Sequence, residues 1–212
     1  MHIPDGLLPL PAVLGGFVAT GIATWYALRQ INRSSNPRAG IPKAALLSAA
    51  FFVLSSIAIP IPPASVHLTL CGMLGVLLGV YAVPAILIGL FLQAILFGHG
   101  GITTLGVNGI MLGAPALIAM MLFRIGTAKC QSERCALIIG GFAGALGAAL
   151  AVLIFAGIVI GFLPAALHGS TERTAITFFM MAHAPLIIAE GVVTGLLIVF
   201  LRRVHPQLLQ GS

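Results

Sequence analysis

Charged side chains are scarce in this sequence. Asp, Glu, Lys and Arg make up 7% of its 212 residues, and only four residues are acidic. A soluble globular domain carries about 25% charged residues. Because 59% of the chain is hydrophobic, a water-soluble fold of this length could not hide its apolar surface. The composition therefore excludes a soluble domain and predicts a protein that lies partly in lipid.

Three further features are missing, and each one narrows the possible functions. No G-x-x-x-x-G-K-[ST] phosphate loop occurs, so the chain does not hydrolyse ATP by that route. No segments of alternating hydrophobicity occur, which argues against a membrane β-barrel. The first residues carry no Lys or Arg, so we expect no cleaved signal peptide. The net charge of +6 is spread thinly along the chain and does not indicate nucleic-acid binding.

Long apolar segments dominate what remains. A membrane-spanning helix needs about 20 apolar residues, and the chain has room for six or seven of them. We predict one all-α polytopic membrane domain over residues 1–212, with about seven transmembrane helices. The third and fourth segments are short and nearly continuous, so a six-span alternative stays open. The expected spans are 7–28, 43–59, 66–79, 82–97, 109–124, 135–162 and 181–201.

Basic residues predict the orientation of these spans. With seven spans, nine of the ten basic residues fall on one side, and only Arg173 falls on the other. The positive-inside rule makes the basic side cytoplasmic. The N-terminus then lies outside and the C-terminus in the cytoplasm. The nine residues are Arg29, Arg33, Arg38, Lys43, Arg124, Lys129, Arg134, Arg202 and Arg203.

A glycine-rich loop, F-G-H-G-G-I-T-T-L-G-V-N over 97–108, lies on the predicted outer side. It carries no formal charge, and irregular backbone at membrane depth survives only when it is buried in protein or lines a cavity. We therefore expect a re-entrant or capping loop that packs into the bundle. Gln93 precedes this loop by one turn. Asn108 ends it, where its side chain is suited to cap the fifth span.

Several polar residues within or beside the spans are candidates for a binding site. Glu190 is the only acid deep in a span, and such a carboxylate is a functional candidate by default. A structural or conformational role is favoured for it over direct metal ligation. His99, in the glycine-rich loop, and His183, at the start of the last span, are weaker candidate ligands. The sequence places His205 in a cytoplasmic tail.

The first two residues, Met1 and His2, contain the donors of a metal chelate. A bulky second residue keeps the initiator methionine in place, so its α-amine is available. That amine, the backbone nitrogen of His2 and the imidazole Nδ1 of His2 can bind one ion in a plane. Nitrogen ligands in a plane suit Ni(II) or Cu(II), whereas Zn(II) prefers a tetrahedron.

This chelate leaves one corner of the square vacant. His67 is a neutral nitrogen donor on the same predicted side, and we expect it to fill that corner. Pro4 stiffens the preceding backbone, and Asp5-Gly6 has the turn chemistry to fold the terminus inward. The alternative is that His2 is a terminal residue without a role.

Four stretches together resemble the CbiM/NikM family, the substrate-binding membrane components of energy-coupling-factor cobalt and nickel transporters. The first and third are the most specific, and the four together cover nearly the whole chain. They are M-H-I-P-D-G at the start, V-H-L-T-L-C-G-M-L-G-V-L-L-G over 66–79, Q-A-I-L-F-G-H-G-G-I-T-T-L-G-V-N over 93–108, and H-A-P-L-I-I-A-E-G-V-V-T-G over 183–195.

The resemblance implies a seven-span fold whose N-terminus inserts into the bundle from the outer side. It implies a square-planar site made by Met1, His2 and His67, with the loop 97–108 covering it. It also implies three kinds of partner: a membrane coupling protein, two cytoplasmic ATPase subunits and often a small accessory membrane protein. By the same resemblance, the residues that orient the ligands or shape the loop are Gln93, His99, Thr103 and Asn108.

These observations lead to one functional prediction with alternatives. We expect a transporter subunit, not an enzyme, that captures Ni(II) or Co(II) as its substrate and has no cofactor. The sequence does not choose between the two metals. The main alternative is a stand-alone, gradient-driven permease with Glu190 and His183 as its proton path. An intramembrane hydrolase using Ser65 beside His67 is disfavoured, because no acidic residue nearby in sequence could orient the base.

Two stripes of small residues are candidates for helix docking. Small side chains at every fourth position let helices approach closely. Such a stripe serves either contact with the coupling protein or packing within this chain, and the sequence leaves both open. One stripe comprises Gly15, Ala19, Ala23 and Ala27, and the other comprises Ala45 and Ala49.

Overall fold

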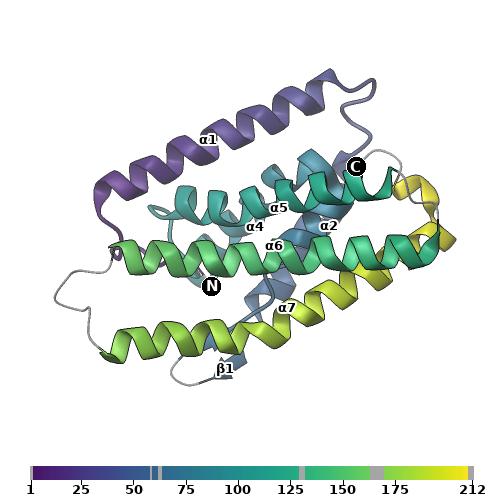
Figure 1. The fold of residues 1–212 in the computed structure, drawn as a ribbon. Helices are drawn as coiled ribbons and strands as arrows, with labels where there is room; N and C mark the ends of the chain where they lie inside the picture. The colour runs from purple at the N-terminus through teal and green to yellow at the C-terminus, as the bar shows by residue number, and fades with distance from the viewer. Residues whose placement is uncertain (1, 58, 62–63, 129–131, 163–169, 210–212) are drawn as a thin grey trace.

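The computed structural model of the chain is helical and contains one small β-hairpin (Figure 1). It describes all residues except 1, 58, 62–63, 129–131, 163–169 and 210–212. The helices are α1 (Leu10–Arg33), α2 (Ile41–Ser56), α3 (Cys71–Leu78), α4 (Ala82–Phe97), α5 (Leu105–Thr127), α6 (Glu133–Phe162) and α7 (Ser170–Val204). Short 3₁₀ turns, Gly79–Tyr81 and Pro206–Leu208, follow α3 and α7. Strands β1 (Ile59–Ile61) and β2 (Ala64–Val66) pair antiparallel, with Ile59 opposite Val66.

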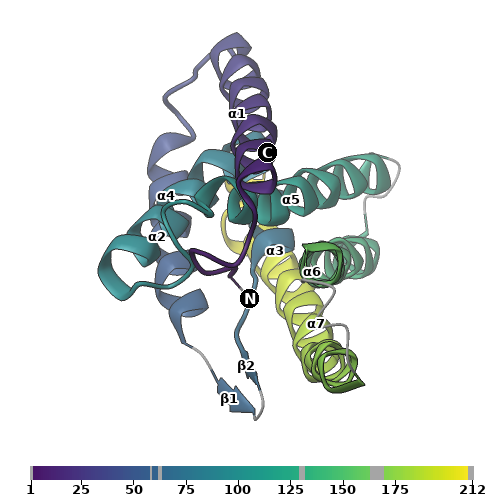
Figure 2. The same ribbon diagram turned by 90° about the vertical axis from the view of Figure 1, so that its left-hand side faces the viewer.

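The shortest helix, α3, lies at the centre of the bundle. All eight of its residues are buried, and they pack against α5 and α6. Glycines make this close approach possible, since a Cβ on Gly72 would meet the backbone of α6 at Gly144, and one on Gly75 would meet that of α5 at Ala116. The longer helices α6 and α7 lie side by side along one flank (Figures 1 and 2).

The segment Cys71–Phe97, which contains α3 and α4, is too short for two full membrane spans. By length and composition it counts as one 27-residue apolar stretch, which as a straight helix would measure about 40 Å. However, His67 before it and His99 after it have ring centroids only 6.1 Å apart. The stretch therefore folds back on itself at Gly79, whose φ of 59° suits glycine.

This reversal changes the form of the predicted third span, 66–79. Its helix begins at Cys71 and is about 12 Å long, too short to cross a hydrocarbon core of about 30 Å. Between β2 and the start of α3, residues 67–70 form neither helix nor strand. The all-helical class is confirmed, and the count of seven crossing helices stays a prediction.

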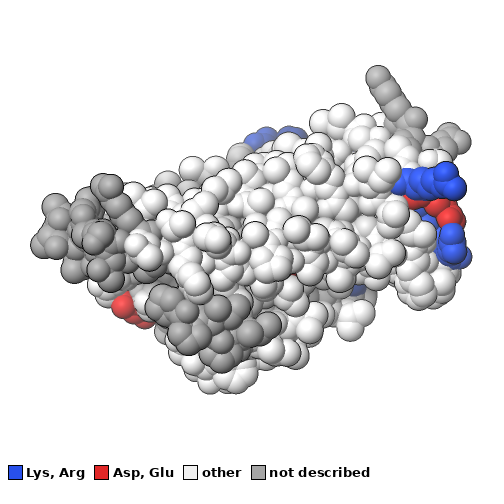
Figure 3. Space-filling view, turned by 60° about the horizontal axis from the view of Figure 1, so that its bottom comes forward, with Lys and Arg blue, Asp and Glu red and all other residues white. Residues whose placement is uncertain are grey.

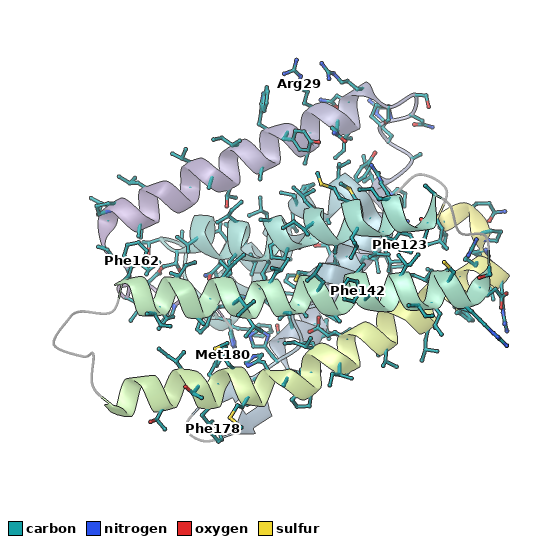
Figure 4. All side chains as sticks on the ribbon, in the orientation of Figure 1. Arg29, Phe123, Phe142, Phe162, Phe178 and Met180 are labelled. Atoms are coloured by element: carbon teal, nitrogen blue, oxygen red, sulfur yellow. The ribbon has the colours of Figure 1, made fainter. Side chains whose placement is uncertain are left out.

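Apolar side chains cover the outside of the molecule, as expected for a protein in lipid. Five helical stretches are long and apolar enough to span a membrane, and α2 is a shorter apolar helix. Figure 4 shows Phe142 and Phe178 on the outer faces of α6 and α7, where 60% and 38% of these residues are exposed. The broad face in Figure 3 carries almost no charge, and Lys and Arg are visible at one end and at the upper edge of the view.

The tight packing of α3 predicts a specific stability effect. Gly75→Ala should lower the free energy of unfolding by about 1–3 kcal/mol, because the added methyl group meets the α5 backbone. Thermal unfolding in detergent measures this change. The matched control is Gly157→Ala in α6, where a Cβ has nothing within 4 Å. Equal stability of the two variants would contradict the packing argument.

Candidate metal site

Three histidines from distant parts of the chain lie together at one end of the buried helix α3. The rings of His2 and His67 have centroids 4.9 Å apart and planes only 5° from parallel. His99 stands edge-on to both, with centroids 5.7 Å from His2 and 6.1 Å from His67. Figure 2 shows the N-terminal segment running into the middle of the molecule beside α3.

The nitrogens of these rings suit metal coordination. Neither ring nitrogen of His2, both shielded from solvent, has a hydrogen-bond partner among the described residues. Nδ1 of His67 lies 3.1 Å from the carbonyl oxygen of Leu68. A carbonyl only accepts, so Nδ1 carries the proton and Nε2 has the lone pair that a metal requires.

Burial keeps the imidazoles near the terminus neutral. It is the largest cause that lowers the pKa of His2 well below its ordinary value, and the neighbouring His67 lowers it further. Burial also lowers the pKa of His99. Because the neutral imidazole is the form that binds a metal, both rings are ready to coordinate at neutral pH.

The N-terminal segment is anchored by the first turns of α5. The Asn108 side chain pairs with the backbone of Ile3: its Oδ1 accepts from the Ile3 amide at 2.9 Å, and its Nδ2 donates to the Ile3 carbonyl at 3.1 Å. Thr104 donates its hydroxyl to the same carbonyl at 2.7 Å. The Ile3 side chain is fully buried and packs with Val107 and Met111.

This anchor corrects the predicted role of Asn108. Helix α5 begins at Leu105, four residues before the predicted fifth span, and its N-cap is Thr104. Asn108 therefore lies inside the first turn and does not cap the helix. Its side-chain amide instead binds the backbone of Ile3, next to His2.

Asp5 fastens the same segment to the glycine-rich loop. Its carboxylate accepts hydrogen bonds from the Thr103 amide at 3.0 Å, the Thr104 amide at 3.3 Å and the Thr103 hydroxyl. The Thr103 hydroxyl is the largest cause that lowers the Asp5 pKa. A Cβ on Gly101 would overlap the Asp5 carboxylate, so the loop needs glycine there. The sequence predicted that Asp5 and Gly6 fold the terminus inward. It did not predict that Asp5 accepts hydrogen bonds from Thr103 and Thr104.

Glu190 makes no described hydrogen bond to the histidine cluster. It binds the chain just after His67. Its carboxylate accepts from the Thr69 amide, from the Thr69 hydroxyl at 2.8 Å and from the Leu70 amide at 2.9 Å. These groups lie at the start of α3, where Leu70 has the uncommon positive φ of 53°. The structural role favoured from the sequence fits this arrangement.

Gln93 and His183 are buried beside other elements. The Gln93 amide donates to Ser55 at 2.6 Å and Ser56 at 3.1 Å, which ties α4 to α2. Its backbone carbonyl accepts from the His99 amide at 3.1 Å and so helps to start the loop. His183 donates from Nδ1 to the Phe179 carbonyl at 2.8 Å. Neither side chain makes a described hydrogen bond to His2, His67 or His99.

The spacing of His2 and His67 fits a shared ion. Two imidazoles bound at adjacent corners of a square have ring centres about 4.5 Å apart, since each metal–nitrogen bond is about 2 Å long. The observed 4.9 Å is close to this value, but the two rings are stacked. Each bound imidazole must contain the ion in its own plane, so one ring must turn before the two can share an ion. In the described part of the chain, no three His, Cys, Asp or Glu side chains surround one point closely enough to hold an ion. The predicted chelate needs only two imidazoles, because its other nitrogens come from the main chain, and Met1 lies outside the described residues.

Comparison with known proteins extends over nearly the whole chain. Residues 2–208 match the family model for CbiM, the cobalt uptake substrate-specific transmembrane region. The chain belongs to the CbiM family. This membership confirms the resemblance seen in the sequence and makes the protein a multi-pass membrane protein for cobalt or nickel transport.

Individual relatives agree with the CbiM assignment. A putative metal transport protein of Haemophilus influenzae is 32% identical, with 99% of this chain and 97% of the relative covered. The fused nickel transport protein NikMN of Rhodobacter capsulatus is 34% identical, and the match covers 99% of this chain and 64% of that longer protein. A crystal structure of a truncated transition metal transporter superposes with a TM-score of 0.82 at 27% identity, covering 97% of this chain and all of that one.

The Asp5 contacts predict a change in metal affinity. Asp5→Ala should weaken Ni(II) binding about tenfold, because the hydrogen bonds from Thr103 and Thr104 no longer hold the N-terminal segment to the loop. Isothermal titration calorimetry measures the dissociation constant. Thr127→Val, which removes a hydroxyl bond to Phe123 at the opposite end of α5, should leave it unchanged. Equal affinities for the two variants would show that Asp5 does not anchor the site.

Proposed function

We propose that this protein is the substrate-specificity subunit of an ATP-driven energy-coupling-factor importer, and that it captures Ni(II) or Co(II) from the outer side of the cytoplasmic membrane. The observation that carries the proposal is the closeness of the His2 and His67 rings, whose centroids lie 4.9 Å apart although their positions in the sequence are 65 residues apart. The in-plane ligands are the Met1 amine, the His2 amide nitrogen, His2 Nδ1 and His67 Nε2. Such nitrogen planes suit divalent late transition metals.

The distribution of basic residues supports an outward-facing site. Helix α1 begins a few residues after His2 and ends at Arg33, a distance of about 36 Å for 24 residues. Arg203, which pairs with Glu133, closes the last helix. The positive-inside rule assigns these basic ends to the cytoplasm, which puts the N-terminus and the histidines on the opposite side.

In this proposal, separate protein chains hydrolyse ATP and complete the transporter. Two relatives are named as fusions, the nickel transport protein NikMN and a putative cobalt transport protein CbiMQ, and both are longer than this chain. We infer that this chain works with separate counterparts: a membrane coupling protein, two cytoplasmic ATPase subunits and often a small accessory membrane protein. An apolar groove of about 560 Å³ between α1, α2 and α4 offers the coupling protein a docking surface.

The two small-residue stripes differ in how far they are exposed. Ala27 is fully buried and packs with Val80 and Met120, so the α1 stripe serves partly for packing within the chain. Ala45 and Ala49 are exposed and line the groove. The α2 stripe is therefore the better candidate for contact with the coupling protein.

The stand-alone permease has less support. It requires Glu190 and His183 to pass protons, whereas Glu190 holds the start of α3 and His183 is bonded to its own helix. Uptake by cells that make only this chain, abolished by a protonophore, would favour the permease over the importer. Uptake that requires the ATPase subunits would favour the importer.

The chelate predicts that a free, unextended N-terminus is essential. Adding two glycines before Met1 should abolish high-affinity Ni(II) binding, because the amine moves away from its corner of the plane. Equilibrium dialysis measures the binding. The same two glycines added after Ser212 are the matched control and should have no effect, whereas His2→Ala and His67→Ala should both abolish binding. Retained binding by the extended protein would refute the chelate.

The groove predicts a separation of binding from transport. Ala45→Leu combined with Ala49→Leu should fill the groove and reduce ATP-dependent uptake at least about tenfold, because close helix approach requires small residues. The Ni(II) dissociation constant should stay within about twofold of the original. Val53→Leu, on an exposed part of α2 outside the groove, is the control. Unchanged uptake by reconstituted complexes of the double variant would rule out docking in this groove.

A further inference from the structure

We propose that an acidic side chain of the membrane coupling protein enters a polar cavity beside α2 and pairs with the ammonium group of Lys43. This inference rests on the proposed function, because it names one contact of the importer's docking surface. The cavity has a volume of about 350 Å³ and lies between the start of α2, the end of α3 and the turn that follows α7. The polar residues that line it are Ser34, Ser35, Asn36, Lys43, Tyr81 and Gln207.

Lys43 is a partly buried cation that can bind a further ligand. An ammonium group has three N–H donors. Two described oxygens accept from it, the backbone carbonyls of Leu77 in the last turn of α3 and of Leu208 in the final turn. These carbonyls solvate the ammonium group without neutralising its charge, whereas buried charges in proteins are ordinarily paired with opposite charges. One donor and the full positive charge are therefore left for a ligand in the cavity.

The acidic side chains of this chain are committed elsewhere or lie far away. The sequence has no Asp or Glu over 6–132, which covers α1 to α5. Glu172 lies in the first turn of α7, about 50 Å along that helix from the turn that contains Leu208. The other three acids have described hydrogen bonds away from Lys43, and they are Asp5, Glu133 and Glu190. The carboxylate that would pair with Lys43 therefore has to come from another molecule.

The cavity adjoins the apolar groove in which the coupling protein is proposed to dock. Tyr81 lines both of them. Its hydroxyl donates to the Pro37 carbonyl at 2.7 Å, and a Cβ on Gly40 would overlap its ring. The loop before α2 is thus held against Tyr81, which keeps the cavity and the groove side by side. A protein that fills the groove brings its neighbouring side chains to the cavity.

The charge of this surface selects an acidic group of the partner. Among the described lining residues, the charged ones are Arg38 in the groove and Lys43 in the cavity, and both are basic. Complementary charges guide encounter and fix the register of an interface, whereas like charges placed together disfavour it. A carboxylate beside the apolar contacts of the coupling protein satisfies both the groove and the cavity.

The test measures binding of the coupling protein, with its ATPase subunits, to this chain in nanodiscs of neutral phosphatidylcholine. Lys43→Glu should raise the dissociation constant at least about thirtyfold, because two carboxylates then meet in the cavity. Lys43→Arg keeps the positive charge and should change the constant less than about threefold. Arg29→Glu is the matched control, since Arg29 points outward from α1 (Figure 4) and lines neither the groove nor the cavity. It should also change the constant less than about threefold.

A charge exchange separates ion pairing from a purely structural role of Lys43. Each Asp and Glu of the coupling protein is changed to Lys in turn. We expect one of these changes to weaken binding to the unsubstituted chain and to restore binding by Lys43→Glu to within about threefold of the original. If Lys43→Glu does not fold, Lys43→Met removes the charge and keeps an apolar stem. Its binding should be weaker, and the same change in the coupling protein should weaken it no further.

Three results would overturn the assignment. Equal losses for Lys43→Glu and Arg29→Glu would show only a general effect of charge, and the absence of any restoring change would show that no acidic side chain pairs with Lys43. An effect of Lys43 that requires anionic phosphatidylglycerol in the nanodiscs would assign the cavity to a lipid headgroup. If the unsubstituted chain forms no complex with the coupling protein, the importer itself fails, which distinguishes that failure from failure of the Lys43 contact.

Discussion

The pairing of the Asn108 side chain with the backbone of Ile3 is the contact on which the site depends. It satisfies both polar groups of a buried residue next to His2, at 2.9 Å and 3.1 Å, where an unpaired backbone group would be costly. Asp5 and Thr104 add hydrogen bonds to the same loop and helix. The segment beside a chain terminus, ordinarily a loose part of a domain, is thereby fixed where the His2 ring lies beside His67.

The other half of the site depends on a short, deeply buried helix. Helix α3 can lie at the centre because glycines let α5 and α6 approach it closely. The amides of Thr69 and Leu70, just before the helix, would be costly to leave unpaired in an apolar interior, and Glu190 of α7 accepts hydrogen bonds from both. The carboxylate that looked like a candidate ligand thus supports the turn that carries His67, and it links the site to the longest helix.

Periodicity and local chemistry predicted much of this protein. Most apolar segments became helices near the expected bounds, and the sequence predicted that the first residues, His67 and the glycine-rich loop belong to one site. The structure brings His2, His67 and His99 close together. The predicted start of the third helix and the Asn108 cap were wrong for a common reason: in an almost wholly apolar sequence, hydrophobicity alone does not mark where a helix starts. Asp5 and Thr104 were missed as anchors because their partners lie about 100 residues away in the chain.

The sequence by itself determined that the chain is a helical membrane protein and that its first two residues contain chelating nitrogens, since both follow from composition and covalent structure. Only the tertiary structure decided which histidines meet. The distance of 4.9 Å between His2 and His67, and the perpendicular ring of His99, result from the reversal at Gly79 and from side-chain bonds between distant segments. Such bonds depend on packing in three dimensions, which no local pattern specifies.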